Sequence, residues 1–139
     1  ERIAAHVGAE NVMAFAADNL LASPGAIVGT TDGQRHRIPT LVPARHGNGA
    51  CRFLRGNGDC SIHAVSPFGC AFFDTHQTPE ESDNLSMQGL KAISHEWERP
   101  DDSLYAIIWN ILLEAGMTAP DPMLARAKMA AAMAVAANR

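Results

Sequence analysis

The chain has 139 residues, a formal net charge of −4 and an apolar content of 47%. This length fits one domain, which we expect to span residues 1–139 and to fold without the help of a metal ion or a disulfide. The basic residues are too few and too scattered to follow the phosphates of a nucleic acid, so no nucleic-acid partner is expected. No apolar run approaches the roughly 20 residues of a membrane-spanning helix.

The start of the chain and its cysteine count bear on its location. No basic and apolar leader opens the sequence, which predicts a cytoplasmic protein. Glu1 stands without a Met inside a helical pattern, which indicates a fragment of a longer product. Three is an odd number of cysteines, and in a reducing compartment such residues more readily bind a metal than form disulfides.

Residues 1–22 are predicted to be helical. Apolar residues recur there at mostly helical spacing, and Gly8 and Asn11 interrupt the pattern, so we expect two helices at about 2–7 and 10–22. The sequence Ser-Pro-Gly then ends helix formation, because proline lacks an amide donor and glycine permits left-handed geometry.

Short strands are predicted over residues 26–43. The sequence Thr-Asp-Gly between two β-prone runs is typical of a hairpin, with strands near 26–30 and 35–42. Pro39 and Pro43 place the second strand at a sheet edge, since proline donates no hydrogen bond to a ladder.

Residues 50–76 contain all three cysteines. Four glycines and prolines within 14 residues, Gly56, Gly58, Pro67 and Gly69, favour tight turns over a helix. This segment is therefore predicted to be a cysteine-rich, irregular, metal-binding loop.

A long helix is predicted to follow this loop. Thr78 is suited to the N-cap and Pro79 to the first helical position, and acidic residues occupy the first turn, where the helix dipole favours them. The helix should extend from about residue 79 to 97.

The rest of 79–137 is also predicted to be helical. Asp101 or Asp102 is expected to cap a second helix that ends at Gly116, and a last, Ala- and Met-rich helix is expected over 122–137. The predicted fold is thus α+β, mainly α-helical, with a short β-hairpin and a cysteine-rich irregular loop.

The chemistry of the loop depends on Cys51, Cys60 and Cys70. Their thiolates can converge on one metal ion only if the chain doubles back twice, and the turns Arg-Gly-Asn-Gly-Asp and Ser-Pro-Phe-Gly allow this. The spacing lacks the close cysteine pairs of a zinc ribbon. A redox pair with a spare thiol, or three small apolar core residues, are therefore alternatives.

A zinc ion takes four ligands, and thiolates with one imidazole are an ordinary set. His46, His63 and His76 are candidates for the missing ligand, and the last two lie inside or beside the cysteine segment. Asp74 could orient the imidazole of His76. No oxyanion-hole loop accompanies a Cys–His pair, and the common nucleotide-binding and hydrolase motifs are absent.

The stretch CRFLRGNGDCSIHAVSPFGC resembles the second half of the cysteine cluster of the YkgJ-type zinc- or iron-chelating family. The matching positions are Cys51, Leu54, Cys60, Ile62, Pro67 and Cys70. The helical start of the chain also resembles the stretch that follows the first half of that cluster. The resemblance implies metal binding by the three cysteines, as a zinc ion, an iron ion or an iron–sulfur cluster.

The sequence departs from the family pattern in three ways. The upstream cysteines are absent, which indicates either truncation or divergence. His63 replaces an aromatic residue and is a candidate ligand, whereas Ser66 replaces an arginine that could neutralise a thiolate-rich site.

These observations predict a cytoplasmic zinc- or iron-binding module whose metal ligands are Cys51, Cys60, Cys70, His63 and His76. We expect it to be an accessory protein or a subunit of a larger assembly, with a protein partner at the C-terminal helices. Two alternatives are a redox or metal-dependent enzyme with an iron or iron–sulfur centre, and a structural interaction subunit whose metal site has decayed.

Overall fold

The structure is a computed structural model that describes residues 2–25, 27–29, 31–68, 70, 77–121, 124, 127, 128 and 130. Helices combine with small antiparallel sheets, which confirms the α+β class. The described elements, in chain order, are α1 (Arg2–His6), α2 (Val12–Asn19), β1 (Leu20–Ser23), β2 (Ile27–Gly29), β3 (Arg35–Arg37), β4 (Thr40–Pro43), the 3-10 helix η1 (His63–Val65), α3 (Pro79–Glu98) and α4 (Leu104–Glu114).

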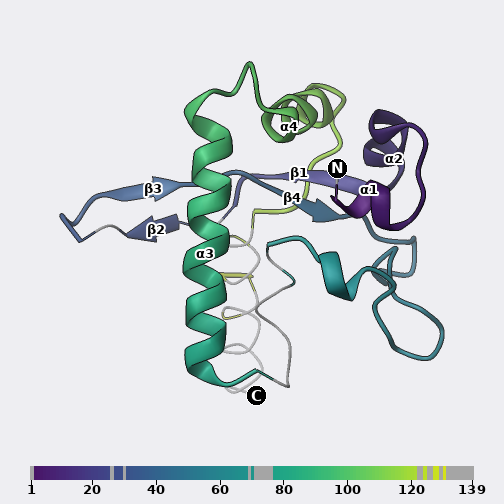
Figure 1. The fold of residues 1–139 in the computed structure, drawn as a ribbon, viewed down its shortest axis with the longest axis horizontal. Helices are drawn as coiled ribbons and strands as arrows, with labels where there is room; N and C mark the ends of the chain where they lie inside the picture. Colours follow the sequence, from purple (N-terminus) through teal and green to yellow (C-terminus); the bar gives the residue numbers. More distant parts are fainter. Residues whose placement is uncertain are drawn as a thin grey trace.

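Two separate two-stranded sheets form (Figure 1). In the first, β1 pairs with β4, with Leu20 opposite Pro43 and Ser23 opposite Thr40. In the second, β2 and β3 make the predicted hairpin, which extends away from the body of the molecule as a ribbon. The prediction of one strand over 35–42 is wrong, because residues 38 and 39 separate two strands. The second of them, β4, pairs with β1 and not with β2.

Strand β1 is the element that the sequence pattern did not predict. The predicted helix to residue 22 ends at Asn19 instead, and Asn11 is its N-cap rather than an interruption, accepting from the Ala14 amide at 3.0 Å. Ala22 donates to the Met117 carbonyl at 2.9 Å and accepts from the Ala119 amide at 2.8 Å. Because β1 pairs with β4 on one side and with this returning segment on the other, tertiary pairing overrides its helical pattern.

The long helix begins as the sequence predicts. Thr78 caps α3 in a full capping box, in which its hydroxyl accepts from the Glu81 amide while the Glu81 carboxylate accepts from the Thr78 amide. Ser103, and not Asp101 or Asp102, caps α4 by accepting from the Ala106 amide at 3.2 Å.

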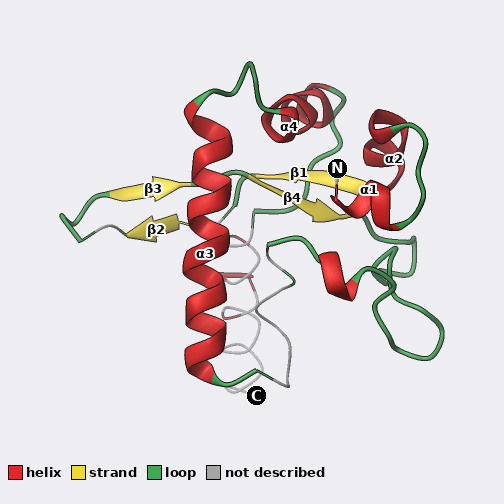
Figure 2. Cartoon of the chain, in the orientation of Figure 1, coloured by secondary structure: helices red, strands yellow, loops and turns green. Residues whose placement is uncertain are grey.

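The apolar core lies between the β1–β4 sheet and the helices and loops around it. Figure 2 shows α4 on one side of this sheet and α1 and α2 at its end. The buried cluster consists of Ala16, Leu20, Ala22, Leu41, Phe53, Ile62, Ile108 and Leu112. Two of these, Phe53 and Ile62, belong to the cysteine segment, so their burial anchors that segment to the core.

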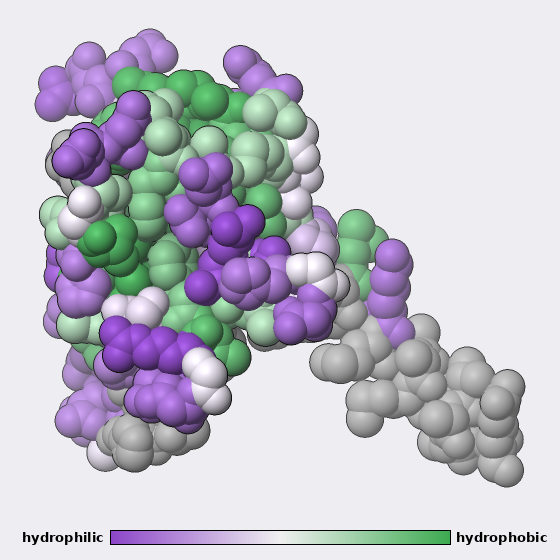
Figure 3. All heavy atoms as spheres, turned by 90° about the vertical axis from the view of Figure 1, so that its right-hand side faces the viewer, coloured by the Kyte–Doolittle hydropathy of each residue, from purple (hydrophilic) through white to green (hydrophobic). Residues whose placement is uncertain are grey.

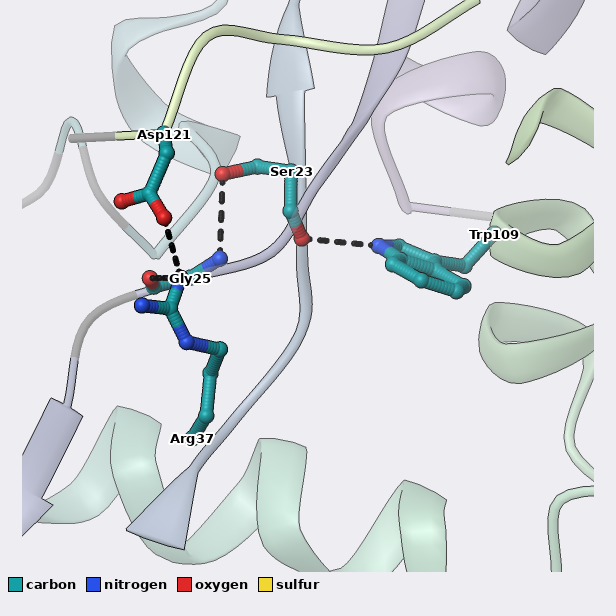
Figure 4. Close-up of polar contacts among 5 residues, drawn as sticks. All are labelled: Ser23, Gly25, Arg37, Trp109 and Asp121. Carbon is teal, nitrogen blue, oxygen red and sulfur yellow. Dashed lines mark hydrogen bonds and ion pairs between the residues drawn. The ribbon is translucent and has the colours of Figure 1, made fainter. Parts of the chain in front are cut away.

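Polar atoms of aromatic side chains connect α3 and α4 to the strands. Trp109 donates to the Ser23 carbonyl at 2.9 Å (Figure 4). Trp97 donates to the Pro39 carbonyl at 3.0 Å. The two indoles meet edge to face, with centroids 5.5 Å apart. These contacts give α3 a fixed position at its C-terminal end.

An ion pair fastens the returning segment beyond α4. The Arg37 guanidinium lies 3.0 Å from the Asp121 carboxylate and also contacts the Gly25 carbonyl at 3.4 Å (Figure 4). The predicted helix over 122–137 lies mostly outside the described residues, although Leu124, Ala127, Lys128 and Ala130 are helical. Among the described helices, none has the length and apolar character needed to cross a membrane.

Candidate metal centre

Two consecutive turns carry Cys51 and Cys60. In the first, Arg45 and Cys51 form an antiparallel bridge, and the His46 amide donates to the Ala50 carbonyl at 2.8 Å. In the second, Leu54 and Cys60 form a bridge of the same kind. Each cysteine therefore lies where its turn returns to pair with the preceding chain.

The core holds both turns in place. Cys51 and Cys60 are half-buried and pack against the buried cluster, and each stands two residues before one of its members, Phe53 or Ile62. The Ser61 amide donates to the Phe53 carbonyl at 2.8 Å, which joins the two turns. The positions of these thiols are thus set by packing and by backbone hydrogen bonds together.

Cys70 lies on a third turn. Its amide donates to the Pro67 carbonyl at 2.9 Å, just after η1. The residue as a whole is exposed, yet burial raises the pKa of its thiol, and charge on Cys51 and on Cys60 raises it further.

Arg45 supplies a cation beside these thiols. Its guanidinium donates to the Gly49 carbonyl at 2.8 Å, which holds the side chain over the first turn, and its charge lowers the pKa of Cys70 against the other effects. Ser66 replaces an arginine of the family pattern, and the sequence did not indicate that Arg45 would supply a cation near Cys70 instead. The signal was the turn between Arg45 and Cys51, which places the two residues opposite each other.

The candidate histidines lie at separate places in the chain. His63 is exposed in η1, and His76 lies outside the described residues. His6, which the sequence analysis did not single out, places Nε2 at 3.3 Å from the carbonyl of Ser61, next to Cys60. A carbonyl only accepts, so Nε2 is the donor in this contact.

Within the part of the chain that the structure describes, no three His, Cys, Asp or Glu side chains form a group that could hold a metal ion. The thiols of Cys51 and Cys60 affect the pKa of Cys70, but the three thiols are not arranged as a set of metal ligands. All three are free cysteines, with no disulfide joining them.

The chain matches no protein-family model, and neither the curated proteins nor the solved structures give a significant match. The resemblance to the YkgJ-type family thus rests on the sequence of the cysteine segment and of the helical start of the chain.

Proposed function

We propose that this chain is a zinc- or iron-binding module of the YkgJ type, and that Cys51, Cys60 and Cys70 are its sulfur ligands. The observation that carries the proposal is a run of three turns, each with one free thiol, of which the first two pack against the core. Arg45 supplies a cation whose charge acts on Cys70. Three thiolates carry a charge that a divalent cation and one guanidinium would offset. The donor chemistry fits zinc, iron or an iron–sulfur cluster, all of which take thiolate ligands.

We propose that a histidine provides the fourth ligand. His63 and His76 are the candidates on the segment itself, since a tetrahedral zinc site takes four ligands. In this proposal the turns tighten on the metal, because structural metal sites commonly form as the ion binds. Three free thiols also fit a reducing compartment, and we propose a cytoplasmic location.

Elemental analysis of protein prepared without oxygen tests this proposal. We expect about one zinc, or stoichiometric iron, per chain in the parent, and loss of most of it in Cys51→Ser, Cys60→Ser and Cys70→Ser. Ser61→Ala, which changes the neighbour of Cys60 without removing sulfur, is the matched control. Cysteine variants that hold as much metal as the parent would overturn the proposal.

A visible spectrum of the same samples separates the alternatives. Zinc with thiolates is colourless, whereas iron–sulfur clusters absorb in the visible and would favour a redox or metal-dependent enzyme. Among histidines, loss of metal in His63→Ala or His76→Ala, but not in His95→Ala on the exposed face of α3, would identify the nitrogen ligand.

We also propose that the module is an accessory protein or subunit whose partner contacts the C-terminal helices. Figure 3 shows apolar side chains over the upper part of one face, at the level of α4 and α2. On α4 the large apolar residues that remain exposed are Ile111 and Leu113, each 45% accessible, at the end of the helix. This is a short patch and not a long apolar face, which favours the metal-binding reading over a purely structural interaction subunit.

A further inference from the structure

Gly89, in the middle of α3, lies directly against the ring of Phe68. A Cβ built on Gly89 would stand 2.4 Å from Cδ2 and 2.7 Å from Cε2 of that ring, closer than real Cβ contacts come. The backbone of Gly89 is helical and has no positive φ. Among the described glycines, Gly89 is therefore the one that crowding alone, and not backbone conformation, restricts to glycine.

This contact joins α3 to the turn that carries Cys70. Phe68 directly follows Pro67, whose carbonyl accepts from the Cys70 amide at 2.9 Å, so the ring is part of that turn. In Figure 1 the teal segment after η1 runs toward α3. The segment thus reaches the helix at the position where the helix lacks a side chain.

The helix itself is firmly held and can act as a support. The capping box at Thr78 fixes its start, Ile93 is buried one turn beyond Gly89, and Trp97 bonds to the Pro39 carbonyl near its end. A glycine inside a helix costs about 1 kcal/mol relative to alanine. The ring of Phe68 explains why this helix nevertheless has glycine at this position.

We propose that Gly89 and Phe68 are positioning residues for the cysteine segment: the gap at Gly89 receives the Phe68 ring and so fixes the turn in which the Cys70 amide bonds to the Pro67 carbonyl. The proposal rests on the proposed metal binding for its functional consequence, although the contact itself does not depend on a metal.

Zinc affinity, measured by competition with a chromophoric chelator, tests the proposal. Gly89→Ala should displace the ring and weaken zinc binding by about 10- to 100-fold, the range for groups that orient metal ligands. Phe68→Ala should weaken it similarly. Asn84→Ala, on the exposed surface of the same helix, raises helix propensity without approaching Phe68 and should leave the affinity unchanged.

The double variant provides the decisive comparison. If Gly89→Ala acts only by displacing the ring, then it should cause no further loss in the Phe68→Ala background. Equal losses in both backgrounds, or a Gly89→Ala protein that binds zinc as tightly as the parent, would overturn the proposal. Far-UV circular dichroism of each variant checks that the helices are retained.

A readout without metal separates this proposal from the proposed function. The Cys70 amide, which bonds within the turn, should exchange its hydrogen severalfold faster in Gly89→Ala and Phe68→Ala than in the parent or in Asn84→Ala. If the two variants exchange faster but the parent binds no metal, then the metal site is refuted and the positioning role stands. Unchanged exchange would overturn the positioning role, whether or not the parent binds metal.

Discussion

Tyr105 illustrates how one buried side chain connects a helix to the sheet. Its hydroxyl oxygen accepts from the Leu41 amide at 2.8 Å, across from α4 to β4. Burial raises the pKa of Tyr105 to about 12, the hydrogen bond from Leu41 opposes this rise, and the charge of Glu96 adds to it. The neutral hydroxyl is therefore the form that the folded protein stabilises.

Replacing Tyr105 by Phe should destabilise the protein at neutral pH. The Leu41 amide loses its acceptor in a buried position, which costs about 1–3 kcal/mol in the free energy of unfolding, measured by urea titration at pH 7.5. Tyr105→Leu is no adequate control because it also changes ring packing. A Phe variant as stable as the parent would show that water or another group satisfies the amide.

The same substitution should change the alkaline stability profile. The folded-state pKa is raised above the unfolded value near 10, so the contribution of Tyr105 is fully present below pH 10 and is lost as pH rises toward 12. Between these values the unfolded chain binds fewer protons, and stability falls. The parent should thus lose stability more steeply from pH 9.5 to 11 than Tyr105→Phe, and parallel profiles would contradict this.

Arg45 should control the ionisation of Cys70. Because the guanidinium lowers the pKa of this thiol, Arg45→Gln should raise that pKa further and reduce the thiolate fraction at pH 8. Iodoacetamide should then alkylate Cys70 more slowly, as followed by mass spectrometry of the peptide. Arg55→Gln, which removes an exposed arginine in the second turn, is the control, and an equal effect in both variants would exclude a specific role for Arg45.

At the scale of elements, the sequence predicts a helix end correctly where the residues next to that end determine it. The predicted start of α3 is confirmed, because Thr78, Pro79 and Glu81 satisfy its first turn without help from the rest of the chain. The end of α2 could not be predicted, because Leu20 and Leu21 suit a helix or a strand, and pairing with β4 decides between them. The cap of α4 was predicted one or two residues too early, because Asp101, Asp102 and Ser103 are all good N-caps.

The capping box predicts a measurable loss for Thr78→Ala. Removing the hydroxyl should reduce the free energy of unfolding by about 1 kcal/mol, whereas Thr78→Ser retains an oxygen and should cost less. The amide and hydroxyl of Thr78 lower the pKa of the Glu81 carboxyl, so its contribution is present at neutral pH and is lost as pH falls through the acid range. The difference between parent and Thr78→Ala should accordingly shrink in acid, and a constant difference would argue against the carboxylate.

At the scale of the whole molecule, the sequence shows which segment carries the cysteines but not where their side chains lie in the fold. Spacing alone allowed convergence, core burial or a redox pair. In the structure Cys51 and Cys60 lie half-buried on two turns that pack against the core, and the three cysteines form no disulfide. Arg45, His6 and the Gly89–Phe68 contact escaped detection because each depends on segments that the fold brings together. The reason for a glycine at position 89 of α3 is a phenylalanine on another segment.

Proton release should identify the thiols that bind zinc. A raised pKa keeps the Cys70 thiol protonated at pH 7, and a thiol must lose its proton to become a ligand. Because each cysteine binds zinc as a thiolate, binding to three cysteines should release up to three protons per ion in a weakly buffered indicator solution, and affinity should rise with pH. Cys70→Ser should release about one proton fewer. Replacing a histidine ligand removes no thiol, so the change in proton count in each variant distinguishes sulfur from nitrogen ligands. If Cys70→Ser released as many protons as the parent, then Cys70 would not be a ligand, and the proposed centre would lose the thiol that its third turn contributes.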